Sequence, residues 1–137
     1  MEEYYAGPER REFLRLPYST PLAYKVCNPE TLSKLLAGYT VNVSQAGLLC
    51  SIKDEVRVED VLWLAFDKSI LIFCSEIERH SLIYQNGVIG KVVRVSRNEN
   101  KTYDIGIKFI TLEEKDALHI KGKTDAIRRE LGQHEKT

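Results

Sequence analysis

The sequence has no excess of charge of either sign and no long apolar run. Its 137 residues include 20 basic and 20 acidic side chains, so the formal net charge is zero, which argues against general attraction to nucleic acids or anionic membranes. No apolar run approaches the roughly 20 residues that a membrane-spanning helix needs. The acidic start, MEEYYAGPERR, lacks the apolar segment of a signal peptide. We therefore expect a single-domain cytoplasmic protein with no membrane insertion.

Motifs that carry enzyme chemistry are also missing. Neither a GxxxxGK[ST] loop nor a GxGxxG loop after a strand is present, so the usual cradles for nucleotide hydrolysis and dinucleotide redox chemistry are absent. The three histidines lie far apart, without the Cys/His spacing of a zinc site. Cys27, Cys50 and Cys74 are odd in number and lie in apolar segments, which predicts reduced thiols. These absences predict that the protein is not an enzyme and holds no metal or cofactor.

Most of the chain consists of short apolar or alternating segments, a pattern typical of a mainly β protein. The expected strands cover residues 19–27, 39–44, 47–52, 61–66, 87–97 and 102–110. The segment 39–44 has the period of a half-buried strand, with Tyr39, Val41 and Val43 on one face. Residues 45 and 46 then form the turn of a hairpin. Six antiparallel strands indicate a small barrel.

Two segments between the strands carry helical signals. Residues 31–38 predict one or two helical turns that end at Gly38. Residues 75–82 predict a short helix that begins with a capping box formed by Ser75 and Glu78.

A closing helix is expected near the C-terminus. Thr111 and Glu114 have the spacing of a second capping box, which marks the start of this helix. Gly122 weakens its middle by about 1 kcal/mol relative to alanine. The whole pattern predicts a six-stranded antiparallel β-barrel closed by a C-terminal α-helix.

Two polar clusters stand out against this background. The first is a set of arginines between two prolines: Arg10, Arg11 and Arg15. The second lies in the hairpin turn: Asn42, Ser44 and Gly47. Each cluster has a local explanation, since arginines often line a solvated face. Asn and Ser can satisfy the backbone of a turn, and glycine supplies a positive φ.

Taken together, the two clusters favour a ligand. Arginine pairs bidentately with phosphate or with the O6/N7 edge of guanine, and its flat face stacks on purines. The polar turn supplies amide and hydroxyl groups for a base edge. The combination predicts a site for a compact dianion that carries guanines.

The segments ERREFLR, NVSQAGL and YDIGIKFITLEEKDAL, in this order, resemble the PilZ family. That family is marked by an RxxxR motif, a [D/N]xSxxG motif and a later strand with a Y-x-I-G-x-x-F pattern before a helix. The resemblance runs from about Glu9 to Ile120. It implies a PilZ-like β-barrel with a C-terminal helix that binds the bacterial second messenger cyclic di-GMP without turning it over. We expect a flexible N-terminus at 1–8, a PilZ domain at 9–120 and a helical extension at 121–137.

The resemblance also implies a role for each residue of the two clusters. The arginines would grip guanine and phosphate, Asn42 and Ser44 would hydrogen-bond a guanine base, and Gly47 would keep the turn open. The family often has glycine where this chain has Ala46, which tightens the turn. Ligand would order the arginine arm, residues 9–15, across the barrel. That step would change a surface for an unidentified downstream protein in motility or exopolysaccharide regulation.

Two other functions remain open from the sequence. The chain could be a PilZ-like interaction scaffold that does not bind nucleotide, although such members lose the motif residues that this chain keeps. It could also be a small barrel that binds RNA or single-stranded DNA. Such a protein needs a basic groove with interleaved aromatic side chains. In the tail, Ile120, Ile127 and Leu131 form an apolar seam that either packs on the barrel or mediates homo-oligomerisation.

Overall fold

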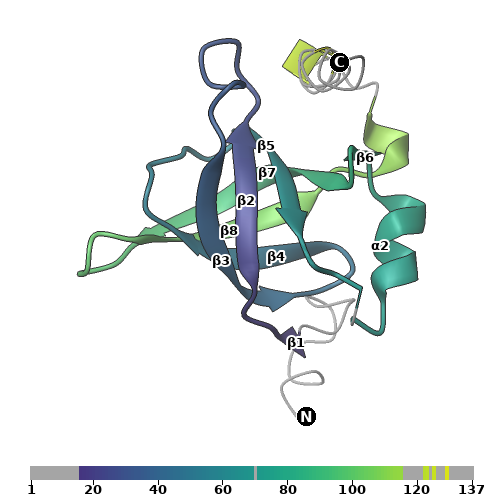
Figure 1. Ribbon diagram of the computed structural model, residues 1–137, viewed down its shortest axis with the longest axis horizontal. Coiled ribbons are helices and arrows are strands. Elements are labelled where there is room, and N and C mark those ends of the chain that lie inside the picture. Colours follow the sequence, from purple (N-terminus) through teal and green to yellow (C-terminus); the bar gives the residue numbers. More distant parts are fainter. Residues whose placement is uncertain (1–15, 70, 116–121, 124, 126–128, 130–137) are drawn as a thin grey trace.

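The computed structural model describes residues 16–69 and 71–115, with residues 122, 123, 125 and 129 beyond them (Figure 1). The arginine arm, the N-terminus at 1–8 and the apolar seam of the tail lie outside the described residues. The expectations for these segments therefore stay predictions.

Six antiparallel strands form a closed barrel (Figure 1). They are β2 (Pro21–Val26), β3 (Leu36–Val43), β4 (Gly47–Ile52), β5 (Val61–Phe66), β7 (Gly87–Arg97) and β8 (Tyr103–Phe109). Their order in the sheet is β3-β2-β5-β7-β8-β4, and pairing of β3 with β4 closes the ring. The expected six-stranded antiparallel barrel is confirmed, and the predicted strands at 47–52, 61–66 and 87–97 have the observed bounds.

Short elements complete the fold. Strand β1 (Leu16–Pro17) pairs with the end of β3, and β6 (Ile83–Tyr84) pairs with β7. Helix α2 (Cys74–His80) lies against one side of the barrel, and the 3-10 helix η1 (Leu112–Glu114) follows β8 (Figure 1). Among the described residues, no helix is long and apolar enough to cross a membrane.

Two of the local helix predictions are wrong. Residues 31–33 form only a turn, and Gly38 lies inside β3, opposite Ile52, instead of ending a helix. Helix α2 is present, but its N-cap is Phe73, with no side-chain capping bond. Because the helix begins before Ser75, that hydroxyl lies within the first turn and cannot cap it.

Alternate side chains of the strands fill two cores. The interior of the barrel contains fully buried residues from every strand, among them Tyr24, Val43, Leu48, Leu64, Val92 and Ile105. A second cluster lies on the other face of β5 and β7, around Trp63 and Ile89. There the Trp63 indole donates a 2.7 Å hydrogen bond to the carbonyl oxygen of Tyr84. The fold is thus held on both faces of these two strands.

Candidate ligand-binding site

A β-bulge in β3 determines where Asn42 points. Thr40 pairs with Cys50, but Asn42 pairs with the adjacent Leu49, so Val41 is an extra residue. A bulge of this kind reverses the faces on which the following side chains lie. Tyr39 is 58% exposed and Thr40 only 1%. The predicted arrangement, with Tyr39 on the same face as Val43, is therefore wrong before the bulge. After it, Val43 points inward, and Asn42 lies on the outer side.

The turn that follows β3 is organised by Ser44. Its hydroxyl accepts hydrogen bonds from the amides of Ala46 and Gly47, each at 3.2 Å, and donates to the carbonyl oxygen of Gly47 at 3.2 Å. The turn is also tied to β8, where the Phe109 amide donates to the Ala46 carbonyl oxygen at 2.8 Å. Ser44 is 4% exposed. Its side chain therefore shapes the turn, as the local explanation of this cluster expected.

Gly47 is needed for a close approach between strands. No described glycine has a positive φ, so the turn does not use glycine in the way the local explanation proposed. Instead, a Cβ atom at Gly47 would lie 2.1 Å from the carbonyl oxygen of Ile107 on β8. Gly47 thus allows β4 and β8 to pair tightly, which closes the barrel beside the turn.

Strand β1 lies beside the end of β3. Leu16, the residue that follows Arg15 in the sequence, pairs with Val43, and Pro17 pairs with Asn42. The Tyr18 amide continues this contact with a 3.0 Å bond to the Val41 carbonyl oxygen at the bulge. The two residues of β1 therefore lie directly beside Asn42 and Val43.

A pocket of about 490 Å³ lies next to this turn. Its lining comes from the turn and from the outer faces of β7 and β8: Ser44, Ala46, Gly47, Val93, Arg94, Gly106, Ile107 and Lys108. Two of these side chains are cationic, and none is a carboxylate. The volume falls within the range of about 300–1,000 Å³ that is common for small-molecule sites. Arg94 and Lys108 were not predicted as site residues, because each shares its strand with at least one other charged side chain and no local pattern singles it out.

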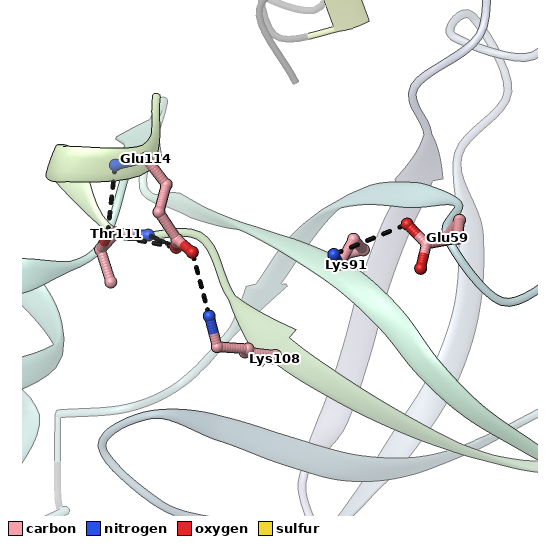
Figure 2. A network of polar contacts seen from close by, with 5 residues as sticks. All are labelled: Glu59, Lys91, Lys108, Thr111 and Glu114. Carbon is pink, nitrogen blue, oxygen red and sulfur yellow. Dashed lines mark hydrogen bonds and ion pairs between the residues drawn. The ribbon is translucent and has the colours of Figure 1, made fainter. Parts of the chain in front are cut away.

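Lys108 is held by a carboxylate outside the pocket lining (Figure 2). Its ammonium group lies 3.1 Å from Glu114, whose other oxygen accepts a 2.9 Å hydrogen bond from the Thr111 amide. The Thr111 hydroxyl accepts from the Glu114 amide, so the predicted capping box is confirmed, although it begins a 3-10 turn. The Thr111 amide and Lys108 hold the pKa of Glu114 below its usual range.

A second pocket, of about 560 Å³, lies on the other side of the turn. Its lining includes Ala46 and Lys108, which it shares with the first pocket, and His80 and Arg79 from α2. Both acidic and basic side chains line it. The two pockets therefore adjoin at Ala46 and Lys108.

The nucleophilic and metal-binding groups offer no catalytic centre in the described part of the chain. Burial raises the pKa of the Cys27 thiol and of the Cys50 thiol to about 12, which keeps both protonated near neutral pH. The described residues contain no cluster of three His, Cys, Asp or Glu side chains that could hold a metal ion.

Comparison with known proteins identifies the fold. The structure is similar to that of the Bacillus subtilis inhibitor of motility, MotI/DgrA, with a TM-score of 0.53 and 16% identity over 90% of this chain and 52% of that one. This likeness shows the fold alone. The structure is also similar to Escherichia coli YcgR in complex with c-di-GMP, with a TM-score of 0.49 and 10% identity over 93% of this chain and 50% of that one. The chain spans about half the length of both proteins.

Sequence comparison gives the family directly. No curated protein matches the chain by sequence. The model of the PilZ domain family, however, matches residues 9–125, which include both polar clusters and all strands of the barrel. Since this match covers far more than half of the chain and the fold is the expected six-stranded barrel, the chain belongs to the PilZ domain family.

Proposed function

We propose that this chain is a receptor for cyclic di-GMP that transmits the signal to another protein without chemically changing the ligand. The observation that carries the proposal is the pairing of β1 with the end of β3. Leu16, which directly follows Arg15 in the sequence, lies opposite Val43, within the second motif of the family. This pairing supports the proposal that two motifs about thirty residues apart in sequence act on one ligand.

The pocket beside the turn suits a ligand with two phosphates. Arg94 and Lys108 supply positive charge, and none of the described residues that line the pocket is a carboxylate. Arg10, Arg11 and Arg15 would add three guanidinium groups that bind phosphate and guanine bidentately. Asn42 is on the outer side of β3 and can present its amide to a base edge. Ser44 would act through the turn that it shapes, and Gly47 through the strand pairing that it permits.

Signal transmission would depend on the arm. In this proposal the ligand orders the arm across the mouth of the pocket and so creates a surface that a downstream protein recognises. The process that this protein controls, whether motility or exopolysaccharide synthesis, would be set by that partner. Trypsin cleaves the peptide bond that follows an arginine. The rate of cleavage after Arg10, Arg11 and Arg15 therefore measures how ordered the arm is. Cleavage should slow when cyclic di-GMP is present, and an unchanged rate would disprove the ordering step.

Calorimetric titration with cyclic di-GMP tests the receptor function. Wild-type protein should bind saturably, and an Arg11→Ala, Arg15→Ala double variant should lose at least about 100-fold in affinity, because each charge-assisted contact contributes about 1.5–3 kcal/mol. An Arg57→Ala, Arg97→Ala variant is the matched control, since it removes the same charge from exposed positions outside the pocket lining.

Each alternative function has its own outcome in this experiment. No binding of cyclic di-GMP by the wild-type protein would favour an interaction scaffold that does not bind nucleotide. Binding of single-stranded RNA or DNA that collapses steeply with added salt would favour a nucleic-acid-binding barrel. Equal affinity of the double variant and its control would show that the arginine arm is not part of the site.

A further inference from the structure

A second β-bulge, in β7, places an arginine in the pocket. Val92 pairs with Ile107, and Arg94 pairs with the adjacent Gly106, so Val93 is an extra residue in β7. Val92 is fully buried, while Val93 is 48% exposed. Because the bulge breaks the alternation of faces, two successive side chains, Val93 and Arg94, lie on the outer side of the strand. A regular strand would have kept only one of them there.

The Arg94 side chain lies beside Gly106. A Cβ atom at Gly106 would lie 3.4 Å from the Cβ of Arg94 and 3.7 Å from its Nε. The stem of Arg94 and the start of its guanidinium group therefore lie next to the β8 backbone at this glycine. Gly106, Ile107 and Lys108 line the same pocket as Arg94.

The charge of Arg94 has no partner among the described residues. Lys108, the other cation of the pocket, is paired with Glu114 at 3.1 Å. No hydrogen bond or ion pair joins the Arg94 guanidinium to another described side chain, and the described residues of the pocket lining include no carboxylate. An exposed cation without a counter-charge among these residues can bind an anion with few existing contacts to break.

We propose that Arg94 contacts a phosphate of the bound dinucleotide. This inference rests on the proposed function and adds to it a contact from the barrel itself. The ligand would lie over Gly106, between the Ser44 turn and the β7 bulge. Arg94 would supply a cation that β7 already holds in the pocket lining.

Titration of cyclic di-GMP into single variants tests this contact. Arg94→Ala should weaken binding about 10-fold or more, and Arg94→Lys should lose less because it keeps the charge. Arg97→Ala is the matched control, because Arg97 is exposed on the same strand and lies outside the pocket lining. Raising the salt concentration should weaken wild-type binding more than binding by Arg94→Ala, because salt screens the charge that the variant lacks.

Gly106→Ala is a second control. The added methyl group would meet only the side chains of Arg94 and Val93, at ordinary contact distances, so the fold should survive. Arg94 should keep its position, and both the affinity and the melting temperature should stay close to those of the wild type.

The possible outcomes separate this inference from the proposed function. If the wild type binds and Arg94→Ala binds as tightly as Arg97→Ala, the phosphate contact is wrong and the receptor function stands. If the wild type does not bind cyclic di-GMP, both are wrong. If Arg94→Ala unfolds, Arg94→Gln decides, because it keeps most of the side chain without the charge: wild-type affinity in that variant would overturn the contact.

Discussion

Gly47 lies so close to Ile107 that a Cβ atom there would sit 2.1 Å from the Ile107 carbonyl oxygen. The contact joins β4 to β8 where the barrel closes beside the polar turn. Gly47, a residue of the second polar cluster, is therefore a requirement of the barrel.

Gly47→Ala should destabilise the protein strongly. The methyl group meets backbone atoms that cannot move without separating β4 from β8, so we expect a loss of roughly 2–4 kcal/mol in the free energy of unfolding. Urea unfolding followed by circular dichroism measures it. Gly106→Ala, where the nearest atoms are side chains at 3.4 Å or more, is the control and should change stability by less than about 1 kcal/mol. Equal effects of the two substitutions would contradict the strand-closure role.

Tyr24→Phe should leave stability unchanged or increase it by about 1 kcal/mol. The Tyr24 hydroxyl is buried in the barrel and has no hydrogen-bond partner among the described residues. Burial, together with the nearby Asp54 carboxylate, raises the pKa of this hydroxyl. Removing an unpaired buried hydroxyl removes a desolvation cost.

Tyr18→Phe is the matched comparison for this substitution. The Tyr18 hydroxyl donates a 2.6 Å hydrogen bond to the carbonyl oxygen of Asp67. Its loss should cost about 0.5–1.5 kcal/mol in the same urea unfolding experiment. If Tyr24→Phe were the more destabilising of the two, the Tyr24 hydroxyl would have to have a partner in solution.

Cysteine labelling should separate the three thiols. Cys27 and Cys50 are buried, and burial raises their pKa to about 12, so neither should react with a thiol reagent at pH 8 in the native protein. Cys74 is only partly buried and should be the single accessible thiol. All three should react in urea. Rapid native labelling of two or more thiols would show that the barrel opens more readily than its packing indicates.

The start of η1 should weaken in acid. The folded protein holds the pKa of Glu114 below its usual value of 4.5, first through the Thr111 amide. A carboxyl with a lowered pKa contributes stability above the unfolded pKa, and this contribution is lost as the pH falls through the folded pKa. The free energy of unfolding should therefore decrease from pH 6 towards pH 3, and Glu114→Gln should flatten part of that decrease.

Glu113→Gln is the control for the acid experiment. Glu113 belongs to the same turn but takes no part in the capping box. It should leave the pH dependence close to that of the wild type. An equal flattening in both variants would mean that the turn responds to its total negative charge instead of the bond to Thr111.

Strand positions were largely predictable, but the faces of β3 were not. The runs 61–66 and 87–97 are apolar enough to indicate buried strands, and both have the predicted bounds. In β3 the alternation predicted Tyr39 and Val41 on the inner face, yet both are exposed and Thr40 points inward. No local pattern reveals the bulge at Val41, because it depends on how β3 registers against β4. The predicted cap at Ser75 is wrong for a related reason. Phe73, the observed N-cap of α2, belongs to the buried core, and this packing depends on distant residues.

The sequence by itself determined the class of the fold, the strands and the two polar motifs that mark the family. It could do so because hydrophobic periodicity and turn residues act locally. Only the tertiary structure decided that β1 brings the chain beside Asn42, that Gly47 serves a strand contact, and that Arg94 lies in the pocket. These relationships depend on pairing between distant strands and on two bulges. Their energies come from contacts that no short segment contains.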